Sequence, residues 1–411
     1  MTGYTGRLAC VRCGFEVDTP APWSGCTACA AEGVHANVLP VYRSDPAGPD
    51  ASQPGIFRYR HRLPVPATAE PVSLHEGATP LVDAGRLTGQ VGVGGLWFKD
   101  EARNPTWSYK DRLAAVAVTN ARAGGADTVA VATTGNHGAA AAAYAAVAGL
   151  RCVVLTVEWV PTTMKVLMQS YGADVFALPT PPERWKLLRQ AVEQWGWVPL
   201  SGYLDPPIGS NPFGVDGYKT IAFEIVEQLG DVPDAVVVPA AYGDGLAGIQ
   251  RGFADLVALG AAERQPRLVA VDPLGAYVAA LAAYPDDPPR VQWQQTSSFS
   301  IGTPIATHQG VAAVRASGGT AVSVPDDGVV MAAQRTIAST CGLFLEASAA
   351  ICLPAVEELV RAGRLGADSR VVCLATSSGL KDIGAAEQRL PPVPVIEPDL
   401  GTLERALAAR S

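Results

Sequence analysis

Residues 97–112, WFKDEARNPTWSYKDR, are the stretch of the chain that says most about its fold. Asn104, Pro105 and Thr106 predict a turn, and the apolar run that follows Lys110 predicts a helix. A lysine at the start of a helix is unusual, because the helix dipole disfavours a positive charge there. The position favours the neutral amine that a covalent bond to an aldehyde requires. Taken alone, the segment also fits a surface lysine on an amphipathic helix.

Short β-branched runs alternate with helical stretches on both sides of this segment. Near-continuous apolar strands separated by helices predict a mainly parallel α/β sheet that is covered on both faces. The predicted strands are Thr128–Ala132, Cys152–Val157, Asp174–Leu178, Ala235–Pro239, Arg267–Val271 and Arg370–Ala375. The predicted helices are Gly138–Ala148, Thr163–Tyr171, Arg184–Trp195, Gly217–Leu229, Leu246–Leu259, Gly328–Thr340 and Ala349–Ala362. Ligands of such sheets bind at the carboxyl ends of strands.

The bulk composition excludes several classes of protein. With 411 residues, 48% hydrophobic and 17% charged, the chain can bury a large core and suits two or three domains. Its formal net charge of -8 argues against nucleic acid as a partner. The N-terminus lacks the apolar core of a signal peptide, and the apolar runs are too short to span a bilayer. We therefore expect a cytoplasmic protein without a membrane partner.

Four of the eight cysteines lie near the N-terminus. Cys10 and Cys13 form one Cys-x-x-Cys knuckle, and Cys26 and Cys29 form a second. Two such turns supply the tetrahedral sulfur shell of a structural Zn²⁺ with no open position. The alternative is four free cysteines. The spacing predicts a zinc-ribbon-like element over residues 1–45.

Glycine-containing loops follow two of the predicted strands. The loop after Ala132 precedes an Ala-rich helix, and the loop after Pro239 precedes another helix. Glycines let backbone amides approach a ligand, and a helix N-terminus favours a carboxylate or a phosphate. Each loop alone also fits an ordinary turn, and Gly243-x-Gly245-x-x-Gly248 also matches a dinucleotide-binding string.

Together these motifs resemble those of a known enzyme family. Residues 104–112 are similar to Asn-Pro-Thr-Gly-Ser-Phe-Lys-Asp-Arg, the cofactor-lysine motif of threonine synthases, which are fold type II pyridoxal-phosphate enzymes. The loops at 133–138, 239–246 and 376–382 resemble the family's substrate-carboxylate, cofactor-phosphate and ring-nitrogen loops, in the family's order. Further matches at 76–81, 165–175, 211–220 and 346–350 extend the resemblance over residues 8–384.

The resemblance implies a domain organisation. We expect two parallel or mixed-sheet α/β domains of the fold type II pyridoxal-phosphate type after the zinc-ribbon-like element. The large cofactor-binding domain would comprise residues 46–122 and 215–411, and a smaller α/β domain, residues 123–214, would be inserted in it. The resemblance also implies a homodimer.

The resemblance assigns roles to individual residues. Lys110 would be joined covalently to pyridoxal 5′-phosphate and would move protons in catalysis. The other cofactor-binding residues would be Asn136 at the 3′-oxygen, a phosphate loop and two hydroxyl residues near the ring nitrogen, with Thr376 preferred: Ala241, Tyr242, Gly243, Asp244, Gly245, Thr376 and Ser377. An amino-acid substrate would contact Thr133, Thr134, Gly135, His137 and Asn211.

Four departures from the family's pattern bear on the reaction. Trp107 stands in place of a glycine beside the lysine motif. His137 replaces a threonine, Gly214 replaces the arginine that clamps the substrate's phosphate, and Tyr218 replaces a glutamine. The last three fall at positions that should recognise O-phosphohomoserine. Lys165 or Arg184 are further cations that could take the place of the missing arginine.

Two classes of reaction therefore stay open. The first is threonine synthase-like lyase chemistry, from O-phosphohomoserine and water to threonine and phosphate. The second is a β- or γ-replacement, or an ammonia-lyase reaction of the serine or threonine dehydratase type, on a different amino acid. A hydroxyl partner at the ring nitrogen suits both, because it leaves the cofactor a weaker electron sink. A non-catalytic binding protein is the third reading, and the intact set of Lys110, Asn136 and Thr376 argues against it.

Overall fold

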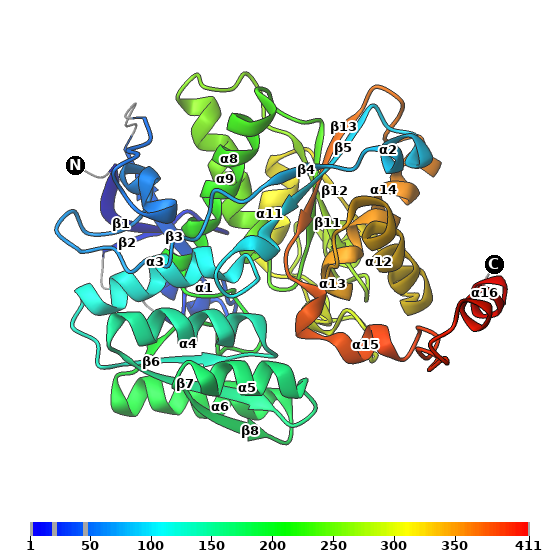
Figure 1. The fold of residues 1–411 in the computed structure, drawn as a ribbon. Helices are drawn as coiled ribbons and strands as arrows, with labels where there is room; N and C mark the ends of the chain where they lie inside the picture. The colour runs from blue at the N-terminus through cyan, green and yellow to red at the C-terminus, as the bar shows by residue number, and fades with distance from the viewer. Residues whose placement is uncertain (1–2, 19–22, 44–47, 410–411) are drawn as a thin grey trace. The chain divides into compact units, whose positions relative to one another are not determined.

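The computed structural model describes residues 3–18, 23–43 and 48–409. The chain divides into two compact units, residues 1–381 and residues 382–411. The first unit holds three sheets and the helices that pack on them (Figure 1). The second consists of two helices, α15 (Ile383–Glu387) and α16 (Leu400–Ala408), joined by an extended segment.

A six-stranded mixed sheet is the larger of the two α/β sheets. Its strand order is β12-β11-β10-β13-β5-β4, and every neighbouring pair is parallel except β4 with β5. Strand β10 is buried along its whole length and β13 after its first residue, as expected for parallel strands covered on both faces. The strands are β4 (Leu81–Asp83), β5 (Gly95–Asp100), β10 (Ala235–Pro239), β11 (Arg267–Asp272), β12 (Thr320–Ser323) and β13 (Arg370–Ala375).

A four-stranded parallel sheet lies within residues 128–199. Its order is β8-β7-β6-β9, from β6 (Thr128–Ala132), β7 (Arg151–Val157), β8 (Asp174–Leu178) and β9 (Val198–Pro199). Helices α4 (Asn136–Ala148), α5 (Thr162–Ser170) and α6 (Pro181–Trp195) connect its strands. Alanines 139–143 are all buried, and their small side chains let α4 lie close to α3 (Lys110–Ala123).

The predicted α/β class is confirmed. All six predicted strands are present, and four of them have the predicted bounds. Two predicted helices are each divided: residues 216–218 form a 3-10 turn before α8 (Lys219–Leu229), and α13 (Ala347–Ala350) precedes α14 (Cys352–Arg361). The other helices around the large sheet are α2 (Arg86–Val91), α7 (Pro212–Val215), α9 (Asp244–Ala258), α10 (Ala276–Ala283), α11 (His308–Ala316) and α12 (Asp327–Cys341).

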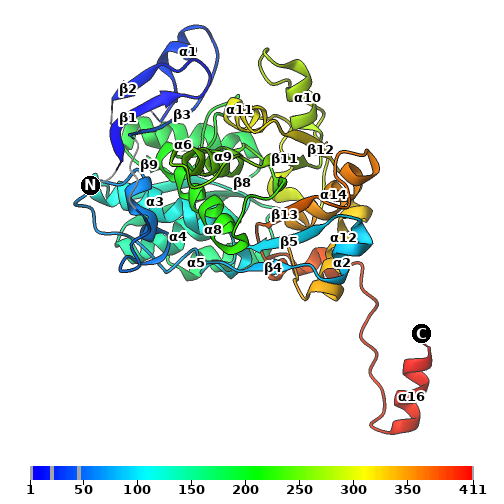
Figure 2. The ribbon, with the colours of Figure 1, turned by 90° about the horizontal axis from the view of Figure 1, so that it is seen from above.

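The N-terminal residues form an antiparallel sheet with the order β2-β1-β3. Its strands are β1 (Tyr4–Cys10), β2 (Glu16–Asp18) and β3 (Val38–Tyr42), with the short helix α1 (Thr27–Ala31) beside them (Figure 2). Leu8 and Val38 belong to the same hydrophobic core as the helices of the α/β sheets, so this element packs on the rest of the first unit. Its predicted boundary with the next domain, between residues 45 and 46, lies outside the described residues.

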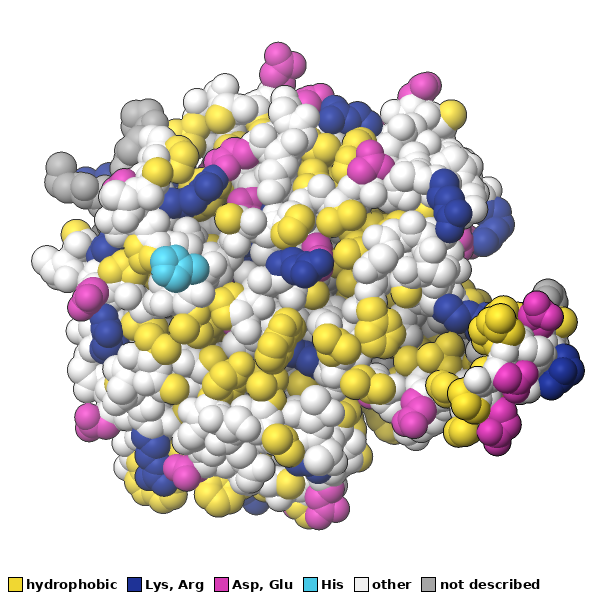
Figure 3. All heavy atoms as spheres, viewed as in Figure 1, with side chains coloured by type: hydrophobic (Ala, Val, Ile, Leu, Met, Phe, Trp, Pro, Cys, Tyr) yellow, Lys and Arg dark blue, Asp and Glu magenta, His cyan; other side chains and the backbone are white. Residues whose placement is uncertain are grey.

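The surface agrees with the composition. On the face shown in Figure 3, Lys and Arg side chains are scattered singly instead of gathering into a basic patch. In the part of the chain that the structure describes, no helix has the length and apolarity needed to cross a bilayer.

A buried cluster of charges joins β5, α3 and α8. Arg112 donates two hydrogen bonds to Glu101 (2.7 and 2.8 Å) and two to Glu224 (both 2.7 Å), and Lys99 Nζ lies 2.7 Å from Glu224 Oε2. All four side chains are at most 3% exposed. Burial alone would raise the pKa of Glu224, but Arg112 and Lys99 lower it to about 2. The interaction of ionised Glu224 with Arg112 and Lys99 therefore stabilises the fold above pH 4.5, and this stabilisation is lost as pH falls toward 2.

We expect Arg112→Met to destabilise the fold by about 3–5 kcal/mol, because it leaves two buried carboxylates facing one lysine. Urea unfolding followed by circular dichroism measures the change. The control is Arg361→Met, which breaks an exposed pair with Glu358 and should cost less than about 1 kcal/mol. An equal decrease in the free energy of unfolding in the two variants would show that the buried cluster stabilises the fold no more than an exposed ion pair does.

Candidate active site

Lys110 is the first residue of α3 and follows directly after the predicted turn. Its Nζ lies 4.7 Å from the ring centroid of Tyr109 and 5.7 Å from that of Tyr218. These two rings stack on each other at 4.7 Å. The amine is half-buried, and the aromatic walls restrict the directions from which a ligand can reach it.

Trp107 adopts a backbone conformation that favours glycine. Its φ is +58°, in the left-handed region where a side chain is strained. The residue is held there by its backbone: its N–H donates to Asn104 O (2.8 Å), and its carbonyl accepts from Ser377 Oγ and Ser378 N (both 3.2 Å). The indole is 44% exposed. The loop therefore keeps its shape although the glycine of the related motif is missing.

Asn136 stands at the centre of a hydrogen-bond network beside this loop. Its Oδ1 accepts from Lys381 Nζ (2.7 Å) and Ser377 Oγ (3.1 Å), and its Nδ2 donates to Glu346 Oε2 (2.8 Å). Ser300 donates to the other oxygen of Glu346. The two donors on Oδ1 fix the orientation of the amide, so the Nδ2 side is the one that can donate to a ligand.

Asp111 and Lys381 are two buried groups of opposite charge in the same region. Burial raises the pKa of Asp111 to about 7, against the effect of two hydrogen bonds from Thr106 and of the positive charge of Lys381. Burial lowers the pKa of Lys381 to about 8, against the effects of Asp111 and Glu346. Both groups therefore change charge near neutral pH, and Lys381 is one of the two donors that orient the amide of Asn136.

The loop between β6 and α4 brings four predicted substrate contacts together. Thr133 Oγ1 accepts from Gly135 N (3.0 Å) and Gly138 N (3.3 Å), which closes the loop, and the hydroxyl of Thr134 is half-buried. His137 is 7% exposed and its Nε2 has no hydrogen-bond partner among the described residues. Burial, helped by the charge of Lys110, lowers the pKa of His137 well below its usual value, so this imidazole is neutral.

The predicted phosphate loop, residues 241–245, joins β10 to α9. Gly243 has φ +72° and is the residue before α9, as a loop that turns its amides toward a helix axis requires. A Cβ on Gly245 would lie 3.0 Å from the ring of Tyr109, so this glycine permits the close approach of the loop to the lysine segment. The side chain of Asp244 is bound to Ser210 and Gln309.

The structure distinguishes the remaining predicted residues. Thr376 and Ser377 follow β13 directly; Ser377 donates to Asn136, and within the described part of the chain the Thr376 hydroxyl makes no hydrogen bond. Asn211 is 3% exposed and caps α7: its Oδ1 accepts from Phe213 N and Gly214 N, and its Nδ2 donates to Pro199 O. Its side chain is thus engaged with the protein, and its contact with a substrate stays a prediction.

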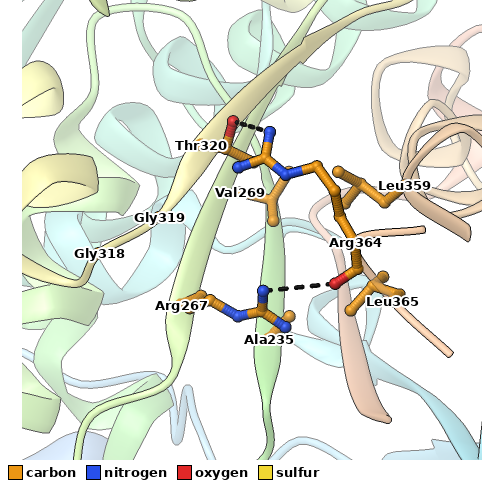
Figure 4. Close-up of a pocket in the computed structure, with 9 residues that line it drawn as sticks. All are labelled: Ala235, Arg267, Val269, Gly318, Gly319, Thr320, Leu359, Arg364 and Leu365. Carbon is orange, nitrogen blue, oxygen red and sulfur yellow. Dashed lines mark hydrogen bonds between the residues drawn. The ribbon is translucent and has the colours of Figure 1, made fainter. Parts of the chain in front are cut away.

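A small pocket lies at the opposite edge of the large sheet. Figure 4 shows Arg364 bonded to Thr320, and Arg267 bonded to the carbonyl of Arg364, at the amino ends of β10, β11 and β12. Ligands of parallel sheets bind at the carboxyl ends. We therefore assign this pocket no part in the site around Lys110.

The four N-terminal cysteines converge as their spacing predicts. Sγ–Sγ distances of 3.5 to 3.7 Å join Cys10, Cys13, Cys26 and Cys29. Four sulfurs at about 2.3 Å from one metal would be about 3.8 Å apart, close to these values. Backbone amides of residues 12, 13 and 29 donate to Cys10 or Cys26, as knuckle turns allow. The four sulfurs fit a tetrahedral metal site with no open coordination position.

Comparison with known proteins now decides the family. A family profile described as "Pyridoxal-phosphate dependent enzyme" matches residues 72–377. The chain belongs to this family. The match includes the lysine loop, the Asn136 loop, the phosphate loop and the ends of the strands that carry them. The predicted resemblance is confirmed, and the protein is a pyridoxal-phosphate-dependent enzyme.

Its relatives include several threonine synthases. Threonine synthase of Methanocaldococcus jannaschii is 34% identical over 86% of this chain and 87% of its own length. The enzyme of Methanosarcina acetivorans is 33% identical, with 92% of each chain covered. That of Mycobacterium tuberculosis is 33% identical over 83% of this chain and 93% of its own. The chain is thus a threonine synthase-like member of the family and is similar to these lyases over most of its length.

Solved structures share the fold at lower identity. Processed threonine deaminase isoform 2 from Solanum lycopersicum has a TM-score of 0.65 and 19% identity over 85% of this chain and 97% of its own. Diaminopropionate ammonia lyase from Escherichia coli has a TM-score of 0.64 and 19% identity over 77% and 88%. Both confirm the fold type II architecture with parallel and mixed sheets.

The residues around Lys110 fit the family's cofactor. Ser108 Oγ and His137 Nε2 are buried polar atoms that have no hydrogen-bond partner among residues 3–18, 23–43 and 48–409, and buried polar atoms are rarely left without one. The glycines of residues 243–245 leave room for an anion at the start of α9. When bound, pyridoxal 5′-phosphate supplies an electron sink for negative charge at the substrate's Cα. Lys110 would hold it, and Asn136 would donate to it.

Three residues of the site were not assigned a role from the sequence. Glu346 and Lys381 lie inside the matched motifs of residues 346–350 and 376–382, so the sequence indicated that these segments belong to the site. It did not indicate that the two side chains bind Asn136. Ser300 lies in no recognised motif, and nothing in the sequence could have shown that it reaches Glu346. All three act through Asn136 or its partners, which the chain brings together from separate elements.

Replacing Lys381 tests the buried lysine. Its pKa is about 8 in the fold, against an ordinary 10.5, so burying the protonated amine destabilises the fold. This destabilisation is complete below pH 8 and decreases as pH rises to 10.5. The stability of Lys381→Met relative to wild type should therefore fall as pH rises through this window. Urea unfolding at several pH values measures it, with the exposed Lys186→Met as control. A pH-independent difference would contradict the assignment.

Proposed function

We propose that the chain converts O-phosphohomoserine and water to threonine and phosphate. The observation that carries this proposal is the 33–34% identity with threonine synthases over 83–92% of the chain, together with Lys110 at the head of α3. A small-molecule amino acid would be the substrate. The cytoplasmic location, the homodimeric state and the absence of a nucleic-acid partner stay predictions.

The residues divide the work between binding and proton transfer. Lys110 would carry the cofactor and then move the proton of the substrate's Cα, because its amine projects from a helix start between two aromatic rings. The loop of Thr133, Thr134 and Gly135 would bind the substrate carboxylate at the start of α4. Neutral His137 would close the site against water without adding charge.

The roles at the ring and phosphate of the cofactor follow the same geometry. We infer that Asn136, oriented by Lys381 and Ser377, donates to the ring's 3′-oxygen. Thr376, whose hydroxyl has no seen partner, would meet the ring nitrogen, and Ser377 is the fallback. Backbone amides of residues 241–245 would hold the cofactor phosphate at the start of α9.

A second function is favoured by one observation. The position of the arginine that the family uses for the substrate's phosphate holds Gly214, and a Cβ there would lie 2.8 Å from Leu113 Cγ, so a larger residue would need Leu113 to shift. An ammonia-lyase or a β- or γ-replacement enzyme acting on a substrate without phosphate needs no such arginine. Release of ammonia and a keto acid from serine or threonine would identify the first of these alternatives.

A direct assay tests the proposed reaction. The wild-type holoenzyme should release phosphate from O-phosphohomoserine and form threonine in equal amounts. Lys110→Ala should lose its yellow colour and at least about a hundredfold in turnover, because both the covalent link and the proton carrier are removed. Lys186→Ala, at an exposed position of α6, should keep both. Release of ammonia from serine or threonine, without release of phosphate from O-phosphohomoserine, would instead support the second function.

We further propose that the four N-terminal cysteines hold a structural zinc ion. The purified protein should contain a single zinc ion per chain, and Cys13→Ser and Cys26→Ser should each lose it and lower the melting temperature, because binding energy stabilises only the folded state. Cys341→Ser, outside the cluster, should retain it. Emission spectrometry of metal content and thermal unfolding give the result. A metal-free wild type with unchanged stability would leave four free cysteines.

A further inference from the structure

The position where the family carries its phosphate-binding arginine is tightly packed in this structure. Gly214 lies in α7 against α3, where a Cβ would meet Leu113 Cγ at 2.8 Å and the Leu113 carbonyl at 3.0 Å. A side chain at this position would therefore require Leu113, on the helix that begins with Lys110, to shift. If the substrate carries a phosphate, its counter-charge must come from another part of the chain.

Arg184 is a buried cation that has no acidic partner. It lies on the inner face of α6, one turn before Leu188, and is 5% exposed. Its one hydrogen bond runs from Nε to the carbonyl of Pro181 (3.2 Å). Among the described residues no carboxylate lies within ion-pair distance of it. Both terminal nitrogens of the guanidinium are therefore available to a ligand.

Arg184 lies beside the loop that follows β10, as the contact of its neighbour Trp185 with Tyr242 shows. Helix α6 begins three residues after β8 ends, at the carboxyl edge of the four-stranded sheet. The neighbouring ring of Trp185 lies edge-on to Tyr242 at 6.1 Å between centroids. Tyr242 belongs to the loop that follows β10, at the carboxyl edge of the large sheet. Arg184 thus faces the predicted phosphate loop across the interface of the two sheets.

The electrostatics agree with this placement. Burial lowers the pKa of Arg184, and Tyr242 is the one titratable group seen to oppose that effect in the described chain. Burial raises the pKa of Tyr242 to about 12, and the nearby cations Arg184 and Arg290 act against this. The carboxylates near Tyr242 are already engaged: Asp205 with Arg290 (2.6 Å), and Asp244 with three hydrogen bonds.

A buried guanidinium without a counter-ion is unfavourable, and an anion that enters the site would offset that cost. A phosphate monoester suits it best, because the planar guanidinium can donate two parallel hydrogen bonds to two phosphate oxygens. The phenol of Tyr242 can donate a third.

We propose that Arg184 and Tyr242 form the subsite for the phosphate group of the substrate and replace the arginine that Gly214 excludes. This proposal rests on the proposed function. The cofactor's own phosphate has the same chemistry, and the experiment below separates the two sources.

The test compares wild-type holoenzyme with Arg184→Gln and with a matched control. The control is Arg189→Gln, on the same helix but exposed and paired with Glu193. Inorganic phosphate is the probe, and calorimetric titration gives its dissociation constant. Arg184→Gln should weaken phosphate binding at least about tenfold (about 1.4 kcal/mol), since two charge-assisted hydrogen bonds are lost. Arg189→Gln should bind phosphate as wild type does.

Two further measurements complete the test. Apoenzyme of Arg184→Gln should bind pyridoxal 5′-phosphate with unchanged affinity. If Arg184→Gln binds pyridoxal 5′-phosphate more weakly than wild type but inorganic phosphate equally well, Arg184 belongs to the cofactor site and the proposal is overturned. The proposal is also overturned if the wild-type holoenzyme does not bind inorganic phosphate. Because the arginine is buried without a partner, Arg184→Gln should fold with an unchanged or higher melting temperature. Arg184→Lys, which keeps the charge but not the bidentate geometry, should bind phosphate with intermediate affinity.

The subsite and the proposed function can fail separately. If wild type does not turn over O-phosphohomoserine but binds inorganic phosphate in an Arg184-dependent way, the proposed reaction is wrong and the anion subsite stands. If Arg184→Gln turns over O-phosphohomoserine with an unchanged KM, the reaction stands and the subsite is wrong. The expected result is a raised KM for O-phosphohomoserine in Arg184→Gln and an unchanged KM in Arg189→Gln.

Discussion

The position of Lys110 depends on Arg112, two residues further along α3. Its guanidinium binds Glu101, at the end of β5, and Glu224, on α8, so one side chain joins three elements inside the core. Two cations and two carboxylates balance there without solvent. Because charges of this kind are stable only when all partners are in place, the start of α3 has one favourable position, and the loop of residues 104–109 is held between that helix and the last strand.

Much of the fold could be predicted from the sequence, because its central strands are continuous apolar runs between glycine-containing loops. Four strands of the two α/β sheets were not predicted: β4, β5, β9 and β12. Strands of two to four residues lack a pattern distinct from a loop, and the apolar run of β5 ends in the buried charged residues Lys99 and Asp100. The order of the motifs indicated which loops meet. The contacts of Asn136 with Lys381 and Glu346 could not be predicted, because they join side chains more than two hundred residues apart, whose meeting depends on the packed elements. Asn211 shows the reverse: its motif was recognised, but its capping of α7 was not.

The N-terminal element is connected to the phosphate loop through buried amides. Asn37, just before β3, donates to Gln309 on α11 (3.0 Å), and Gln309 donates to the Tyr242 carbonyl (2.9 Å) and to Asp244 (2.7 Å). Asn37 and Gln309 are at most 2% exposed. A cysteine cluster far from Lys110 in the sequence is thus tied to the loop expected to hold the cofactor. This connection gives the element a physical reason to be retained on the enzyme.

The close packing of Gly214 against Leu113 constrains how this chain could change its preference for ligands. An arginine at position 214 would place its Cβ 2.8 Å from Leu113 Cγ and 3.0 Å from the Leu113 carbonyl, so Leu113 would have to move. Space must first be made at position 113, and that step alone would leave a void in the core. The order of the two substitutions therefore matters, and each is harmful without the other. Attempts to redirect the enzyme by design would meet this epistasis first.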